Sequence, residues 1–84
     1  MGKYEKLMTT ILSGRSDKSI RFSELISLLG AMNFNERNKG DHHILHKEGI
    51  EEILNLQPLE SLAKAYQVKQ VRNLIIKYQL ESPQ

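Results

Sequence analysis

Residues 34–56 read FNERNKGDHHILHKEGIEEILNL and contain two glycine turns. A turn is expected at 39–41, because its glycine tolerates unusual backbone angles and its aspartate bonds its own backbone. A second tight turn is expected at 47–49, which also ends in glycine. The turns separate three candidate strands, at 34–38, 42–46 and 50–56. Two successive hairpins predict a small three-stranded antiparallel sheet.

Apolar stripes at helical spacing flank this region on both sides. Gly14 is expected to cap the end of a first helix, whose stripe is Tyr4, Leu7, Met8, Ile11 and Leu12. Ser23 is a candidate N-cap for a second helix ending near Asn33, with the stripe Leu25, Ile26, Leu28, Leu29 and Met32. Beyond Pro58 and a loop at 59–65, the third stripe is Val68, Val71, Leu74, Ile75 and Tyr78. This order of elements predicts an α+β fold with helices packed on one face of the sheet.

Size and composition predict one globular domain. The 84 residues suit a single domain, and 39% hydrophobic with 26% charged residues is typical of a folded chain. The net charge of +2 permits a polyanionic partner without requiring one. The absence of cysteine excludes a disulfide framework, a zinc–thiolate site and a cysteine nucleophile. Because no stretch resembles a signal peptide or a membrane span, we expect a cytoplasmic protein.

The three histidines of the chain, His42, His43 and His46, stand close together. On a helix, His42 and His46 would lie one turn apart and share an ion, but the segment between Gly40 and Gly49 is too short for a stable helix. On a strand, four residues span roughly 13 Å, which is too far for one ion. We therefore predict neither a metal site nor a cofactor.

Two interpretations of the histidines need no ion. In the first, they only satisfy neighbouring groups on half-buried strands. In the second, one imidazole is a general acid–base that takes a proton from one oxygen and returns it to another. RNA cleavage suits such a group, because the substrate carries its own nucleophile, the 2′-hydroxyl, and needs a base, an acid and cations. Arg37 and Lys39 beside the turn are candidate cations, and the residues alone leave both interpretations open.

Several short motifs, taken in order, resemble the HicA family of toxins. The family core is a Ser-Glu-Leu-Ile helix followed by a Gly-Ser-His turn into a strand. Here SELISLL at 23–29 precedes NF at 33–34 and KGDHH at 39–43. The run YQVKQVR at 66–72 resembles the last helix of longer members. The resemblance covers about residues 21–79.

The resemblance implies a fold similar to the double-stranded-RNA-binding domain, with a three-stranded antiparallel sheet packed on two helices. It implies a metal-independent endoribonuclease that cleaves messenger RNA and is neutralised by a HicB-type antitoxin. It divides the single domain 1–84 into an N-terminal helical extension at 1–20, a HicA-like core at 21–79 and a tail at 80–84. The extension either covers part of the sheet, contacts a partner or adds packing to the core.

The resemblance also assigns the site. The family's catalytic histidine directly follows Gly-Ser, which makes His42 the catalytic candidate, with His43 beside it. Gly40 matches the family's glycine, whereas Asp41 stands in place of the serine. Strand register decides which of the two histidines faces solvent, because a slip of one residue exchanges them.

Basic residues near the turn and on the last helix are candidate phosphate contacts. The N-terminus of that helix also favours anions. We expect RNA to be bound by Arg37, Lys39, Lys64 and Lys69, with Arg72 extending the patch. Glu51 and Glu52 are adjacent on an expected strand, so their side chains point to opposite faces and are interpreted as solvated.

Two other functions remain open. The Asp41 carboxylate repels a phosphate, so one alternative is an RNA-binding module without cleavage activity. The other is a protein-interaction domain in which the histidines are structural. The expected partners are RNA and a HicB-type antitoxin, and the chain alone is expected to be a monomer away from any membrane.

Overall fold

The computed structural model describes residues 2–83, and it confirms the α+β fold. The helices are α1 (Glu5–Ser13), the short 3₁₀ helix η1 (Asp17–Ser19), α2 (Phe22–Ala31) and α3 (Ala65–Tyr78). The strands are β1 (Asn35–Lys39), β2 (His42–His46), β3 (Leu54–Leu56), β4 (Pro58–Leu59) and β5 (Leu62–Ala63). The first three strands form an antiparallel sheet in the order β1-β2-β3, and β4 pairs with β5 as a separate small hairpin.

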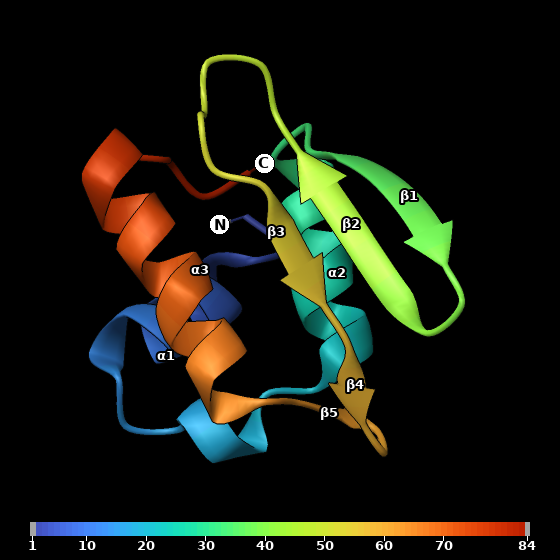
Figure 1. Ribbon diagram of the computed structural model, residues 1–84. Helices are drawn as coiled ribbons and strands as arrows, with labels where there is room; N and C mark the ends of the chain where they lie inside the picture. Colours follow the sequence, from blue (N-terminus) through green and yellow to red (C-terminus); the bar gives the residue numbers. More distant parts are fainter. Residues whose placement is uncertain (1, 84) are drawn as a thin grey trace.

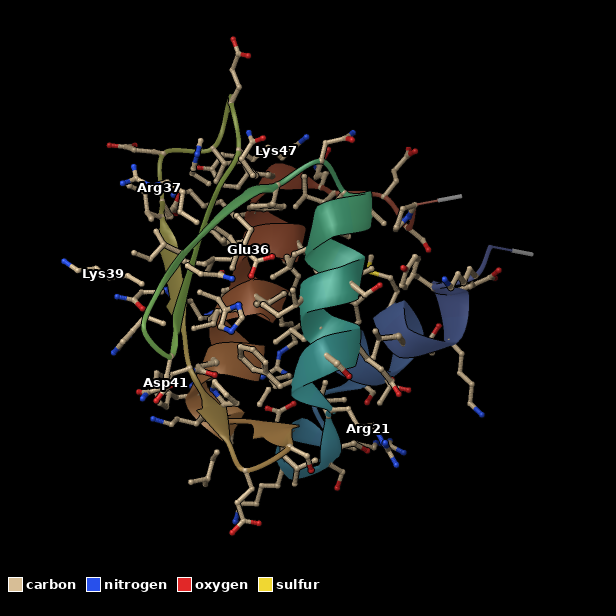
Figure 2. All side chains as sticks on the ribbon, turned by 90° about the vertical axis from the view of Figure 1, so that its right-hand side faces the viewer. Arg21, Glu36, Arg37, Lys39, Asp41 and Lys47 are labelled. Carbon is tan, nitrogen blue, oxygen red and sulfur yellow. The ribbon has the colours of Figure 1, made fainter. Side chains whose placement is uncertain are left out.

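The elements form layers (Figure 1). Helices α2 and α3 lie against one face of the sheet, as predicted, and α1 lies beyond them on the side away from the strands (Figure 2). The core between these layers consists of apolar side chains at the predicted spacings. Its fully buried members are Ile11, Leu25, Leu28, Leu29, Leu45, Leu54, Leu56, Val68 and Val71.

Helix α1 adds packing to the core and lies away from the strands (Figure 2). Met8 and Ile11 of α1 are buried in the main cluster. Gly14 ends the helix with a φ of 71°, which confirms the expected cap. Arg72 on α3 then donates hydrogen bonds to the Ile11 carbonyl oxygen at 3.1 Å and to Asp17 Oδ1 at 2.9 Å. These contacts join both N-terminal elements to the last helix.

The predicted start of α2 at Ser23 is wrong. The helix begins at Phe22, and Arg21 is its N-cap residue with extended backbone angles. The cause is a long-range contact, because Arg21 pairs with Leu62 of β5 and the Phe22 N–H donates to the Ser61 carbonyl oxygen at 3.0 Å. This pairing keeps the chain extended as far as Arg21 and leaves Ser23 exposed in the first helical turn.

The third strand is shorter than predicted. The turn at 47–50 is present, with Gly49 at a φ of 90°, but ladder pairing to β2 is confined to Leu54–Leu56. Glu52 is drawn toward α3 instead: Lys77 Nζ donates to its Oε2 at 2.7 Å and the Tyr78 hydroxyl donates to its Oε1 at 2.5 Å. The bond from Lys77, followed by that from Tyr78, lowers the Glu52 pKa from 4.5 to about 2. The interpretation of Glu52 as solvated therefore lacks its pairing with α3, which leaves the side chain only partly exposed.

Residues 59–65, predicted as a loop, contain the turn and second strand of the β4–β5 hairpin. Glu60 occupies the left-handed region in this turn with a φ of 58°. The hairpin contacts α2, and the chain then enters α3 directly from β5. No helix within residues 2–83 combines the length and the apolar character that a membrane span requires.

Candidate functional site

The hairpin of β1 and β2 decides where the site lies. Lys39 pairs with His42 across a two-residue loop of Gly40 and Asp41. Gly40 has a φ of 61°, and a positive φ at the first loop position is what a type II′ hairpin turn requires. The glycine of the motif therefore has a conformational role, which fixes where the next residue, Asp41, and then His42 leave the turn.

Register sorts the side chains of the sheet into two faces, because directly paired residues lie on the same face and successive residues alternate. The inner face, toward the helices, carries Glu36, Asn38, His43, Leu45, Leu54 and Leu56. The outer face carries Asn35, Arg37, Lys39, His42, Ile44, His46 and Asn55. Figure 2 shows Arg37 and Lys39 pointing away from the helices and Glu36 pointing toward them.

His42 lies exposed on the outer face. Its Nδ1 donates a hydrogen bond to Asn55 Oδ1 of β3 at 2.9 Å. Lys39 stands directly opposite it on β1, where paired Cβ atoms are roughly 5 Å apart. Arg37 is the next residue along β1 on the same face. The imidazole thus shares an open surface with two cations, of which Lys39 is directly opposite it and Arg37 lies at a diagonal position.

His43 lies on the inner face and is half-buried. Its ring meets the Phe22 ring edge to face, with centroids 4.9 Å apart. Its Nδ1 and Glu36 Oε2 form a hydrogen-bonded ion pair when the ring is protonated. These contacts connect β2 with α2 and with β1, which indicates a structural role for His43. Its ring lies on the face of the sheet opposite to that of His42.

His46 lies on the outer face with His42, at the other end of β2. Four residues of strand separate the two rings by roughly 13 Å, so they cannot act on one phosphate together. Within the described residues, no three His, Asp or Glu side chains gather as a metal ligand set would.

The predicted basic residues fall into separate places. Arg37 and Lys39 share the outer face with His42. Lys64 is half-buried and caps the start of α3, and exposed Lys69 lies within that helix, in the layer behind the sheet. Arg72 does not extend a patch with Lys69, because its guanidinium is bonded to Asp17 and to the Ile11 carbonyl oxygen.

Two residues that bond to the histidines are not predicted from the sequence. Asn55 reaches His42 from β3, and Glu36 reaches His43 from β1. Both contacts are diagonal across a strand pair, so they become visible only when the register is known. The predicted turn at 39–41 would pair Asn38 with His42, whereas the structure pairs Lys39 with His42 across Gly40 and Asp41. The first strand is therefore Asn35–Lys39 and not 34–38, and the Glu36 contact does not follow from the predicted register.

Comparison of the chain with protein-family models, with curated proteins and with solved structures finds no match.

Proposed function

We propose that this chain is a HicA-like toxin, a metal-independent endoribonuclease that cleaves messenger RNA and is neutralised by a HicB-type antitoxin. The observation that carries the proposal is the position of His42. The ring is exposed on the outer face at the end of the Gly40-Asp41 turn, with Lys39 opposite it and Arg37 on the same face two residues from Lys39. This is the histidine that the resemblance to the family assigns to catalysis.

The arrangement offers one imidazole for proton transfer and two cations for the phosphate in RNA cleavage by transesterification. His42 removes the proton of the 2′-hydroxyl, whose oxygen then attacks the adjacent phosphorus. The bond from phosphorus to the 5′-oxygen breaks, and that oxygen receives the proton that His42 took up, which gives a 5′-hydroxyl and restores the neutral imidazole. Lys39 and Arg37 balance the charge on the phosphate oxygens. The products are a 2′,3′-cyclic phosphate and a 5′-hydroxyl end.

The reaction is tested with an unstructured RNA in EDTA and with the same RNA carrying one 2′-deoxynucleotide at the cleaved position. We expect cleavage of the all-RNA strand, cyclic phosphate ends, and no cleavage at the deoxy position. Products ending in a 3′-hydroxyl and a 5′-phosphate would contradict the proposed chemistry. Inhibition by a co-purifying HicB-type protein would support the toxin assignment.

Asp41 is the departure from the family pattern that motivates a second candidate, an RNA-binding module that does not cleave. Its carboxylate is exposed on the turn immediately before His42, where the family has serine. At about 5 Å in water, repulsion between two unit charges is about 0.8 kcal/mol, or about fourfold in rate. We expect Asp41→Ser to raise the cleavage rate by about this factor. Glu48→Ser, which removes the same charge beyond the other end of β2, should leave the rate unchanged.

A comparison of wild type with Asp41→Ser distinguishes the nuclease from the RNA-binding module. Binding of RNA by wild type and Asp41→Ser without cleavage by either would support the binding module over the nuclease. The third possibility, a protein-interaction domain, predicts neither binding nor cleavage at low salt.

A further inference from the structure

The contact between His42 and Asn55 joins two strands on the outer face. Asn55 is paired with Ile44, and His42 lies two residues before Ile44 on the same strand. A residue at this diagonal position is within reach of a long side chain. The Asn55 amide bridges the gap, and its Oδ1 lies 2.9 Å from the imidazole Nδ1.

The chemistry of this contact fixes the proton on the ring. An amide oxygen accepts hydrogen bonds and cannot donate them, so Nδ1 must carry the hydrogen. In a neutral imidazole the other nitrogen, Nε2, then has a free lone pair. The bond also limits rotation of the ring, which is exposed.

From this geometry we infer that Asn55 is the positioning residue of the site: it holds neutral His42 in the Nδ1–H form and presents Nε2 as the base. The consequence for catalysis rests on the proposed RNA cleavage, whereas the protonation form of the ring does not. A base that abstracts the 2′-hydroxyl proton through Nε2 requires this form, and the alternative form places a hydrogen where the lone pair is needed.

The protonation form is read directly by two-bond ¹H–¹⁵N correlation spectra of the imidazole at about pH 8.5, where ordinary histidines are neutral. Wild type is expected to show His42 in the Nδ1–H form. Asn55→Ala is expected to shift the ring toward the Nε2–H form. Asn55→Asp, whose carboxylate also accepts from Nδ1–H, is expected to restore the wild-type pattern.

Asn35→Ala is the matched control, because Asn35 is an exposed asparagine on the same face but lies opposite His46. It should leave the His42 signals unchanged. In the cleavage assay, Asn55→Ala is expected to lower kcat about tenfold with little change in KM, since a misdirected base loses part of a 10²–10⁴-fold contribution while the cations that bind phosphate stay in place.

Failure of the inference and failure of the proposed function give different results. An Nε2–H ring in wild type, or an Nδ1–H ring that persists in Asn55→Ala, overturns the inference whether or not RNA is cut. An Nδ1–H ring that depends on Asn55 in a protein that never cuts RNA supports the positioning role and overturns the nuclease.

Discussion

Ile11 tests whether the N-terminal helix is built into the core. Its side chain is fully buried (0% exposed) between α1 and the helices behind the sheet. Truncation of a buried isoleucine to alanine removes its transfer energy and leaves a cavity, which together cost about 2–5 kcal/mol. A chain of 84 residues has a total stability of about 4–13 kcal/mol. Ile11→Ala should therefore remove a large part of the free energy of unfolding.

The measurement is urea unfolding followed by circular dichroism, together with the melting temperature. A loss of about 3 kcal/mol corresponds to a fall in Tm of about 12–24 °C for a domain of this size. Leu12→Ala is the matched control, because Leu12 is the next residue on the same helix and 43% of it is exposed. It should cost about 1 kcal/mol or less. A difference below about 0.5 kcal/mol between the two variants would refute the packing described for α1.

Two further predictions concern Glu52, which precedes β3, and a pair of glycines, one in the β1–β2 turn and one in α2. Because bonds from α3 lower the Glu52 pKa from 4.5 to about 2, its contribution to stability is complete above about pH 4.5 and is lost as pH falls toward 2. Glu52→Gln should lower Tm near neutral pH, and the difference from wild type should vanish near pH 2; a difference independent of pH would contradict the pairing. Gly40→Ala should cost about 1 kcal/mol, because Gly40 has a φ of 61°. Gly30→Ala, inside α2 where an added Cβ meets nothing within 4 Å, should instead stabilise by about 0.5–1 kcal/mol. Chemical denaturation measures both glycine variants, and equal effects of the two would exclude the positive φ as the cause.

Local signals explain the parts of the fold that the sequence predicts. The Gly40-Asp41 turn needs a residue that accepts a positive φ, and the apolar spacing of α3 needs no other element to be recognised. The elements that prediction misplaces depend on distant partners. β3 is limited to Leu54–Leu56, and Glu52, which lies in the predicted strand, bonds to Lys77 and Tyr78 of the last helix. These partners stand more than twenty residues away in the chain, and no window of sequence contains both sides of the contact.

In the candidate site, too, local features can be predicted from the sequence and contacts between distant residues cannot. The sequence identifies the histidine segment, but a register slip of one residue would exchange the sheet faces on which His42 and His43 lie. Pairing of Lys39 with His42 places His42 outside and His43 against Phe22. The diagonal bond to Asn55 requires the register of a second strand pair, and the recruitment of Arg72 by Asp17 requires the position of α1 and η1. Neither is encoded in a local pattern.

The rate of RNA cleavage in EDTA by His42→Ala, compared with His46→Ala, tests the site most directly. Both changes remove an exposed imidazole from the outer face of β2, roughly 13 Å apart. If His42 is the general base, its loss should lower the rate by about 10²–10⁴-fold, while His46→Ala cuts at the wild-type rate. Wild-type cleavage by His42→Ala, or an equal loss in both variants, would contradict the assignment.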